Sequence, residues 1–360
     1  MKKYKTVIVG TGGIAESHVN AVRALPDRFE LVAVADVDAE KVEAYGKKYD
    51  IPRSYTDYEE MLAAEKPDLV QIAVPPLLHV KFSIMAMEAG AWVYCEKPLC
   101  ASLAELDKIE EAEKRTGKFC ASVFQMRFAP SSTHVKKLIE SGRLGKPMIG
   151  IAHTLWYRDL EYYGVSWRGT WKSDFGGPTM ILGIHTMDHV LNLMGEWEEV
   201  RAITATLDRP IEVEDVSMVH VRFKNGALVS MINSALSPRQ ETYIRLDFQK
   251  ATVELKHLYV YQNENWSFTV TDEEKDSGLL EELTSLPEDA PSSHVSQIKA
   301  MVEEMDRNER PSTSGSGVRD TVEFVSAIYK SGFTGEAVKK GTIGKDDPFY
   351  RDLSGKSSKA

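Results

Sequence analysis

The stretch Val7-Ile8-Val9-Gly10-Thr11-Gly12-Gly13-Ile14-Ala15 decides the fold of the first third of the chain. Its apolar start predicts a buried strand, and its glycines predict a tight turn into a helix. Gly10 permits the turn, Gly12 lets the backbone approach a pyrophosphate, and Ala15 allows close packing of the helix on the strand. Gly13 and Ile14 lead into the N-terminus of the helix, where free N–H groups favour an anion. The stretch therefore predicts a dinucleotide-binding turn.

A carboxylate follows the next predicted strand at the spacing that such a turn requires. Asp36 comes directly after the apolar run Glu30–Ala35, close to the roughly 20 residues expected beyond the glycines. Its oxygens can accept hydrogen bonds from the hydroxyls of an adenosine ribose, and its charge repels a 2′-phosphate. We therefore expect NAD rather than NADP, although Lys41 lies nearby. The alternative is a plain strand–helix turn with a surface aspartate.

The first third of the chain alternates apolar runs with amphipathic stretches. The runs are four to seven residues long, and they are Thr6–Val9, Glu30–Ala35, Asp68–Val74, Ala91–Cys95 and Phe119–Val123. Ser102 and Glu105 form a capping box that opens a helix, and Gly117 ends it. Near-continuous apolar strands separated by helices indicate a parallel sheet covered on both faces. We therefore expect residues 1–123 to form a doubly wound α/β domain of the Rossmann type.

The pattern changes after about Phe124, where strands follow one another without helices between them. We expect helices at 131–140, 179–194, 293–307 and 318–331, and strands at 148–156, 200–206, 216–223, 227–233, 243–248 and 251–255. The turn Lys224-Asn225-Gly226 is a strong hairpin signal. Consecutive strands predict an α+β domain over residues 124–347 with a large, mainly antiparallel open sheet. Residues 348–360 are expected to form a flexible tail.

The composition excludes several classes of protein. The 360 residues include 44 Lys and Arg against 54 Asp and Glu, and this net charge of −10 disfavours nucleic-acid binding. No apolar run approaches the ~18 residues of a membrane span, and the N-terminus does not resemble a signal peptide. Cys95, Cys100 and Cys120 have neither disulfide-framework nor zinc spacing. We expect a cytoplasmic protein without a membrane or nucleic-acid partner.

Two further segments make a family recognisable. Residues 68–100 read DLVQIAVPPLLHVKFSIMAMEAGAWVYCEKPLC, and residues 176–188 read GGPTMILGIHTMD. Together with the dinucleotide turn, their order and spacing resemble the Gfo/Idh/MocA oxidoreductases, the family of glucose-fructose oxidoreductase and inositol 2-dehydrogenase. The resemblance runs from Thr6 to about Gly341. It implies hydride transfer between a nicotinamide cofactor and a sugar or polyol, and a homodimer or homotetramer formed through the second domain's sheet.

The resemblance implies two catalytic residues. The lysine of the family's Glu-Lys-Pro motif corresponds to Lys97, which would stabilise negative charge on the substrate oxygen. The histidine of the family's helix corresponds to His185, which would take the hydroxyl proton. Family members often carry Asp four residues before this histidine, where this chain has Ile181. Without this aspartate, three explanations remain open. Another group, such as Asp174 or a network of substrate hydroxyls, assists His185 in proton transfer, the substrate belongs to a different class, or the protein has lost activity.

The remaining cofactor residues are expected on both sides of the strand that ends before Lys97. Pro75 and His79 follow the apolar run at 68–74 and would border the nicotinamide ribose. Glu96 would pair with Lys97 or support its loop.

The substrate is expected to contact Lys97, His185 and three further residues. Arg127 would hold a substrate hydroxyl or carboxylate, with a structural salt bridge as an equal alternative. Trp167 and Arg168 belong to an aromatic and basic stretch that suits a sugar ring, or that simply covers the sheet. No metal site is expected, because the helix with His185 lacks the glutamate of a zinc-binding H-E-x-x-H motif.

These observations predict a NAD-dependent dehydrogenase that oxidises a secondary alcohol of a sugar or polyol. Two alternatives share the same fold. One is a NAD-dependent glycosidase, which releases sugar without net formation of NADH. The other is a nucleotide-binding sugar sensor without enzymatic activity.

Overall fold

The computed structural model describes residues 2–165 and 168–356, which divide into two compact units. Unit 1 comprises Met1–Val123 together with His294–Arg319, and unit 2 comprises Phe124–Ser293 together with Asp320–Ala360. The structure thus places residues 294–319 in the first unit, whereas the sequence analysis assigned them to the second domain. The reason lies in the packing of one helix, described below.

Unit 1 contains a six-stranded sheet with the order β3-β2-β1-β4-β5-β6. Its strands are β1 (Tyr4–Val9), β2 (Phe29–Ala35), β3 (Arg53–Tyr55), β4 (Leu69–Ile72), β5 (Trp92–Cys95) and β6 (Cys120–Ser122). All neighbouring strands are parallel, so their carboxyl ends lie at one edge of the sheet. This is the doubly wound sheet that the sequence predicts, with β3 as an additional short edge strand.

Helices cover this sheet, and one of them comes from the end of the chain. They are α1 (Ala15–Arg23), α2 (Ala39–Lys48), α3 (Tyr58–Glu65), α4 (His79–Glu88), α5 (Leu103–Thr116) and α11 (His294–Arg307). The expected caps of α5 are confirmed, because the Ser102 side chain accepts from Glu105 N and Gly117 adopts a left-handed conformation.

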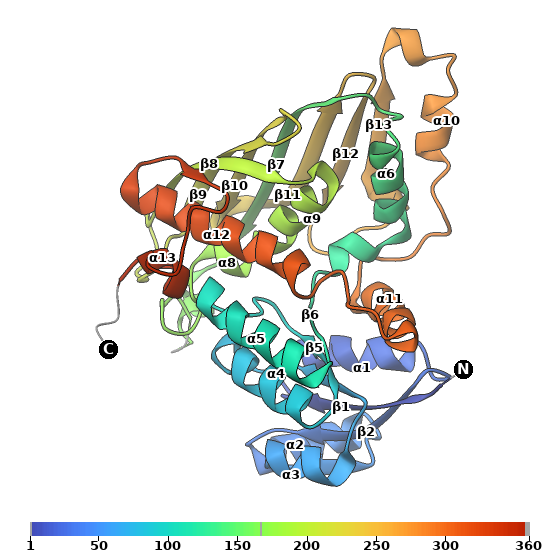
Figure 1. The fold of residues 1–360 in the computed structure, drawn as a ribbon, viewed down its shortest axis with the longest axis vertical. Helices are drawn as coiled ribbons and strands as arrows, with labels where there is room; N and C mark the ends of the chain where they lie inside the picture. Colours follow the sequence, from blue (N-terminus) through green and yellow to red (C-terminus); the bar gives the residue numbers. More distant parts are fainter. Residues whose placement is uncertain (1, 166–167, 357–360) are drawn as a thin grey trace. The chain divides into compact units, whose positions relative to one another are not determined.

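Helix α11 belongs to unit 1 because its apolar face completes the core of that unit. Ile298, Met301, Val302 and Met305 recur at helical spacing, and all four are buried in one cluster with side chains of α1, β2 and β5. Helices α1 and α11 lie side by side in Figure 1. A helix-period pattern does not reveal which sheet a helix will cover, and for this reason the sequence alone assigned this helix to the second domain.

Unit 2 contains an eight-stranded sheet with the order β13-β12-β11-β7-β10-β9-β8-β14. Its strands are β7 (Pro147–Tyr157), β8 (Trp197–Ala205), β9 (Val216–Phe223), β10 (Leu228–Ser234), β11 (Leu236–Phe248), β12 (Ala251–His257), β13 (Trp266–Val270) and β14 (Val338–Lys339). Only β7 and β10 pair in parallel. The sheet is therefore mixed and mainly antiparallel, and the two edge strands β13 and β14 were not expected.

The helices of unit 2 gather on one face of this sheet (Figure 1). They are α6 (Pro130–Glu140), α7 (Leu160–Tyr163), α8 (Pro178–Ile181), α9 (Ile184–Met194), α10 (Leu279–Thr284), α13 (Pro348–Arg351) and most of α12 (Ser316–Thr334). Residues on the other face alternate with buried ones and include several exposed apolar side chains. These are Ile149, Ile151, Ile203, Met218 and Leu228.

Residues 348–356 differ from the expected flexible tail. Helix α13 buries Phe349 and Tyr350, and Leu353 is buried just after it. The Phe349 ring stacks on Phe333 of α12, with centroids 6.1 Å apart. Apolar contact with α12 thus orders this segment, while residues 357–360 lie outside the described part of the chain.

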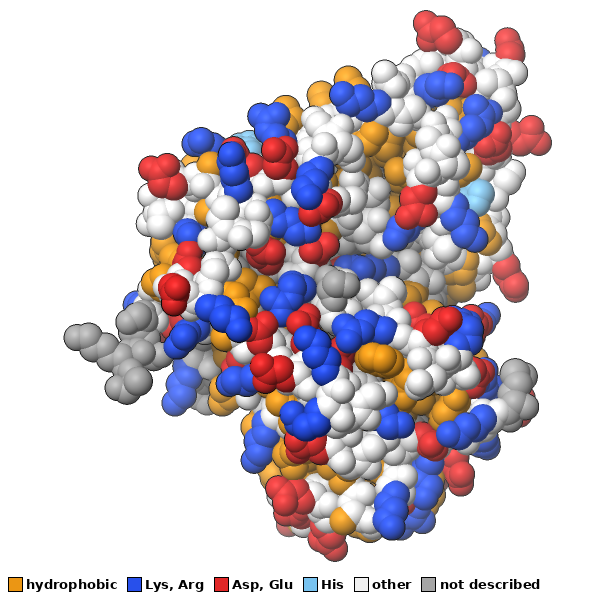
Figure 2. All heavy atoms as spheres, viewed as in Figure 1, with side chains coloured by type: hydrophobic (Ala, Val, Ile, Leu, Met, Phe, Trp, Pro, Cys, Tyr) orange, Lys and Arg blue, Asp and Glu red, His pale blue; other side chains and the backbone are white. Residues whose placement is uncertain are grey.

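The surface carries both acidic and basic side chains, as the 54 Asp and Glu and the 44 Lys and Arg of the sequence lead one to expect. On the face drawn in Figure 2, basic and acidic side chains are interspersed rather than gathered into patches of one sign. Within residues 2–165 and 168–356, no helix combines the length and apolarity that a membrane crossing requires.

Candidate functional site

The glycine turn between β1 and α1 has the geometry that a dinucleotide site needs. Gly10 has a φ of +95°, and a Cβ there would overlap the Ala73 carbonyl after β4. A Cβ added at Gly12 or Gly13 would meet no atom of the described residues within 4 Å. The turn therefore leaves open space beside the first N–H groups of α1. A pyrophosphate fits this arrangement.

Asp36 lies next to this turn. Its Oδ2 accepts hydrogen bonds from Thr11 N at 2.9 Å and from Thr11 Oγ1 at 2.6 Å. Lys41 Nζ lies 3.7 Å from the same oxygen. Partial burial opposes ionisation, but the Thr11 hydrogen bonds outweigh it and hold the pKa of Asp36 below its ordinary value. An ionised carboxylate is thus fixed beside the glycines, as a ribose-binding residue requires.

The turn after β4 carries the next two expected cofactor residues. Pro75 is exposed, whereas His79 is fully buried at the start of α4. The ring nitrogens of His79 lie 2.7 Å from Pro98 O and 2.8 Å from Val74 O. The ring therefore connects the turn after β4 with the loop after β5. Contact of either residue with a cofactor stays a prediction.

Lys97 follows β5 at the carboxyl edge of the sheet and is partly exposed. The Lys97–Pro98 peptide bond is cis. The glycine turn follows β1, Asp36 follows β2 and Lys97 follows β5. All three therefore lie along one edge of the parallel sheet. Ligands bind at this edge in open α/β sheets.

Glu96 points into unit 1. It accepts hydrogen bonds from His18 Nε2 at 3.1 Å and from His294 Nε2 at 2.8 Å. Burial would raise the pKa of Glu96, but the two histidine hydrogen bonds outweigh it and hold the pKa well below 4.5. No local pattern in the sequence indicates these partners, because α1, β5 and α11 bring them together from distant segments.

His185 lies in unit 2, in the first turn of α9, and is 2% exposed. The rings of Phe124 and Tyr259 meet it edge-on, with centroids 6.3 and 5.8 Å from its own. A hydrogen bond of 2.7 Å between Thr186 Oγ1 and Thr154 Oγ1 ties α9 to β7. The imidazole is therefore held in a defined orientation.

Arg127 forms the salt bridge that the sequence left open as an alternative. Its Nε donates to Asp188 Oδ2 at 2.6 Å, and its second nitrogen donates to Asp188 Oδ1. Thr321 Oγ1 also donates to Asp188, at 2.8 Å. Burial raises the pKa of Asp188, while Arg127 and Thr321 oppose that rise. Substrate binding by Arg127 stays a prediction.

The expected helix 179–194 is wrong in one respect, because it consists of two helices. α8 ends at Ile181 and α9 begins at Ile184. A Cβ at Gly183 would overlap the Asn233 side chain of β10, so only glycine permits this close approach. Ile181 and His185 are therefore not neighbours on one regular helix. Asp174, the expected substitute, is buried and accepts from Gly169 N at 2.6 Å.

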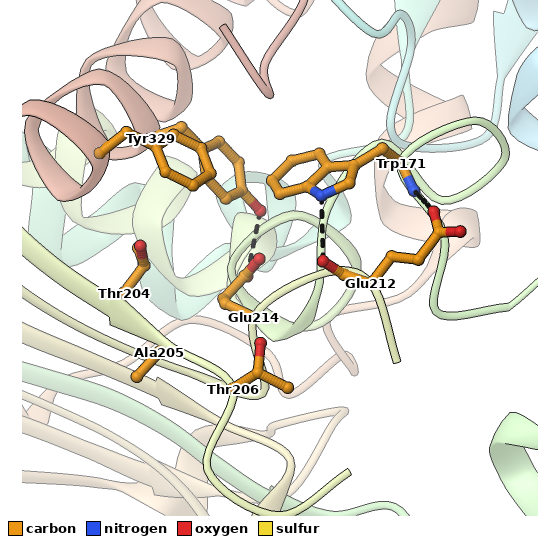
Figure 3. A pocket seen from close by; sticks show the side chains of 8 residues that line it. Trp171, Thr204, Ala205, Thr206, Glu212, Glu214 and Tyr329 are labelled. Atoms are coloured by element: carbon orange, nitrogen blue, oxygen red, sulfur yellow. Dashed lines mark hydrogen bonds between the residues drawn. The ribbon is translucent and has the colours of Figure 1, made fainter. Parts of the chain in front are cut away.

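Two side chains, Glu214 and Tyr329, hold the glycine turn that precedes α8. Glu214 accepts hydrogen bonds from Gly177 N at 2.9 Å and from Thr179 N at 3.1 Å. Tyr329 Oη donates to Glu214 at 3.0 Å (Figure 3). Burial raises the pKa of Glu214, and these donors oppose that rise. A Cβ at Gly176 would overlap Tyr329 Oη. Neither Glu214 nor Tyr329 belongs to a local motif, so the sequence alone does not indicate their role.

A cavity of about 140 Å³ adjoins this turn in unit 2. Besides Glu214 and Tyr329, it is lined by Trp171, whose indole donates to Glu212 O at 3.1 Å (Figure 3). Arg168 and Trp167 are the two expected substrate residues that remain. The Arg168 guanidinium packs over the Tyr162 ring, 3.8 Å from its centroid. Trp167 lies outside the described residues.

Comparisons with known proteins agree with this geometry. Residues 4–124 match the model of an oxidoreductase family with an NAD-binding Rossmann fold, and residues 132–254 match the GFO/IDH/MocA C-terminal domain.

Similar proteins share most of the chain at moderate identity. D-Apiose dehydrogenase of Paraburkholderia graminis is 27% identical, over 98% of this chain and 94% of its own. D-Glucoside 3-dehydrogenase of Escherichia coli is 26% identical, over 72% and 79%. The WlbA dehydrogenase of Bordetella pertussis, solved with NADH and UDP-GlcNAcA, superimposes with a TM-score of 0.81 at 28% identity, covering 94% of this chain and 98% of its own.

Proposed function

Because this chain belongs to the Gfo/Idh/MocA family of NAD-binding oxidoreductases, we propose that it oxidises a secondary alcohol of a sugar or polyol. The observation that carries the proposal is the edge of the unit 1 sheet, where the glycine turn, Asp36 and Lys97 follow three parallel strands. The names of the relatives, dehydrogenases of D-apiose and of D-glucosides, support a carbohydrate as the substrate.

The proposed chemistry divides the work between cofactor and protein. NAD, when bound, supplies the acceptor for the hydride. The Lys97 ammonium group binds the alcohol oxygen and stabilises the negative charge that develops there as hydride leaves the carbon. His185 accepts the hydroxyl proton and returns it in the reverse direction. Asp36 binds the adenosine ribose and selects NAD.

The direct test is an activity assay with two readouts. We would incubate the protein with NAD and a panel of inositols, aldoses and glycosides, and follow NADH by absorbance and free sugar by chromatography. One substrate should yield NADH. Lys97→Ala should lower kcat/KM about 100- to 1000-fold, the effect of removing one group that stabilises an oxyanion. Lys114→Ala, an exposed lysine of α5, is the matched control.

One result of this assay would contradict a dehydrogenase, because release of sugar without NADH would identify a NAD-dependent glycosidase. Binding of NAD with no turnover of any compound in the panel would leave two explanations, a substrate outside the panel or a sugar sensor.

We also propose that the uncovered face of the unit 2 sheet forms a homo-oligomer interface. Ile149, Ile151, Ile203 and Met218 are 44–71% exposed there, and a cluster of exposed apolar side chains marks an interaction surface. Ile151→Glu should lower the mass measured by light scattering to that of a smaller assembly. Leu280→Glu, an exposed leucine of α10, should leave the mass unchanged. An unchanged mass in Ile151→Glu would contradict this interface.

A further inference from the structure

Glu96 is a carboxylate that lies buried in unit 1. It is 7% exposed and immediately precedes Lys97. Among the described residues, its ion-pair partners within 4.0 Å are two histidines, His18 and His294. A buried anion is costly unless hydrogen bonds satisfy it, so this arrangement calls for a functional explanation.

The carboxylate connects the two histidines with the loop that carries Lys97. Glu96 Oε1 accepts from His18 Nε2 and from His294 Nε2, at 3.1 and 2.8 Å. Glu96 Oε2 lies 3.3 Å from the backbone nitrogen of Lys97, which donates to it. One side chain thus connects α1, α11 and the loop after β5.

The histidines are themselves fixed. His18 Nδ1 lies 3.1 Å from Gln71 Oε1 on β4. The rings of His18 and His294 meet edge to face with centroids 5.0 Å apart, and Tyr94 of β5 contacts both rings, at 5.4 and 6.1 Å. Side chains from α1, β4, β5 and α11 therefore restrict the two histidines that donate to Glu96.

The electrostatics of this cluster agree with the geometry. Burial lowers the pKa of His18, and the hydrogen bond to Glu96 only partly offsets this effect. His79 of α4 also acts on Glu96 through its charge when protonated, although burial lowers the pKa of His79. Burial would raise the pKa of Glu96, but the hydrogen bonds from His18 and His294, together with the electrostatic effect of these two rings, hold it well below 4.5.

We propose that His18 and His294 are positioning residues for the reaction, because they fix Glu96 and Glu96 fixes the backbone of Lys97. The proposal rests on the proposed role of Lys97 and extends the functional machinery into α1 and α11. Its physical basis is that a misplacement of a catalytic group by about 1 Å lowers a rate about 100-fold. No residue of the cluster needs to touch the substrate.

A bound metal ion is the competing explanation. The ligand atoms of His18, Glu96 and His294 all lie within 4.8 Å of one another. However, the two N···O distances of 2.8 and 3.1 Å are those of hydrogen bonds, and they satisfy the carboxylate without an ion.

Substitutions at His294 separate donation of a hydrogen bond from packing. His294→Leu removes the donor, and we expect kcat to fall about 100-fold while KM for NAD stays within about threefold. The acid limb of the pH–rate profile should move to higher pH, because Glu96 loses a donor that stabilises its charge. His294→Gln keeps a side-chain N–H and should restore most of kcat.

Ile298→Val is the matched control for packing. Ile298 is buried in the same helix and belongs to the core cluster, so this variant should lower the melting temperature and leave kcat unchanged. Equal kcat values in His294→Leu and His294→Gln would overturn the proposal, as would a kcat in His294→Leu equal to that of the wild type. One equivalent of metal found by elemental analysis, with loss of activity on its removal, would also overturn it.

A second readout needs no substrate. Hydrogen exchange of the Lys97 amide, measured by NMR after selective ¹⁵N-lysine labelling, should be about tenfold faster in His294→Leu than in the wild type, because Glu96 is then free to move. Unchanged exchange would overturn the proposal. Faster exchange in a protein that turns over no substrate would support the positioning of Lys97 but not the proposed dehydrogenase. A failure of the positioning proposal can therefore be distinguished from a failure of the proposed function.

Discussion

At the scale of the residue, Asp36 combines a structural and a selective role. Its Oδ2 accepts both hydrogen bonds from Thr11, while its charge opposes a 2′-phosphate. Asp36→Asn keeps an acceptor for Thr11 and removes the charge. We expect the ratio of Kd for NADP to Kd for NAD to fall about tenfold or more, since hydrogen bonds to charged groups contribute roughly 1.5–3 kcal/mol. Titrations of tryptophan fluorescence with each nucleotide measure this ratio.

The control for this prediction lies two residues away. Asp38 caps α2 by accepting from Lys41 N at 3.0 Å, and Asp38→Asn changes the charge by the same amount. It should leave the ratio unchanged. An equal shift in both variants would mean that general electrostatics, and not the placement of Asp36, selects the cofactor.

Single residues also mark the limit of what the sequence predicts. Gly10 and Asp36 were found from local spacing, and Lys97 from the resemblance to a known family. The structure places all three at the carboxyl edge of the parallel sheet. Their supporting partners were not found. His294 lies 198 residues beyond Glu96, and only the three-dimensional fold brings the two together.

At the scale of the element, the break between α8 and α9 sets the position of His185. Gly183 has ordinary helical angles, so the obstacle to a larger residue is the Asn233 side chain alone. Gly183→Ala should lower the free energy of unfolding by about 1–3 kcal/mol, the usual cost of overpacking. Urea unfolding measures this loss, and Gly344→Ala, where a Cβ meets nothing within 4 Å among the described residues, should cost little.

A double-mutant cycle tests the cause. Combining Gly183→Ala with Asn233→Ala removes the atoms that clash, so the pair should be less destabilised than the sum of the single variants by about 1 kcal/mol. Additive effects would show that Asn233 is not the obstacle.

The elements differ in how far their own residues determine them. The caps of α5 are local, and Ser102 and Gly117 predicted both ends of that helix. Gly183, in the break between α8 and α9, packs closely against Asn233 of β10. The periodicity of residues 179–194 gives no sign of this contact or of the break. Strand β3 has three residues, too few for a period-2 pattern to be visible.

At the scale of the whole molecule, buried histidines make the stability depend on pH. Burial lowers the pKa of His189 to about 3 and that of His257 to about 4, against about 6.5 in an unfolded chain. Below pH 6.5 the unfolded chain binds protons that the folded protein does not, so stability falls as the pH falls. Between pH 6 and pH 4.5 each histidine should cost about 2 kcal/mol.

Urea unfolding at these two pH values measures the effect. His257→Gln should reduce the loss of unfolding free energy between pH 6 and pH 4.5 by about 2 kcal/mol, the contribution of one histidine. His220→Gln, a substitution at an exposed position, should leave this loss unchanged. An unchanged loss in His257→Gln would contradict the assignment of His257 as a neutral buried group.

The order of strands and helices along the chain predicted an α/β unit followed by an α+β unit, and both are present. It did not predict that residues 294–319 return to unit 1. That return is decided by which core the apolar face of α11 completes, a property of packing between distant segments.

This return has a consequence for biosynthesis. The ribosome delivers residues 1–123 first, but α11 follows only after the 170 residues of Phe124–Ser293. At typical rates of synthesis, that interval lasts about 10 to 30 s. During it, the nascent first unit exposes the apolar surface that Ile298, Met301, Val302 and Met305 later cover. A fragment ending at Val123 should therefore bind chaperones or aggregate, and the cell receives a functional nucleotide-binding unit only when translation is nearly complete.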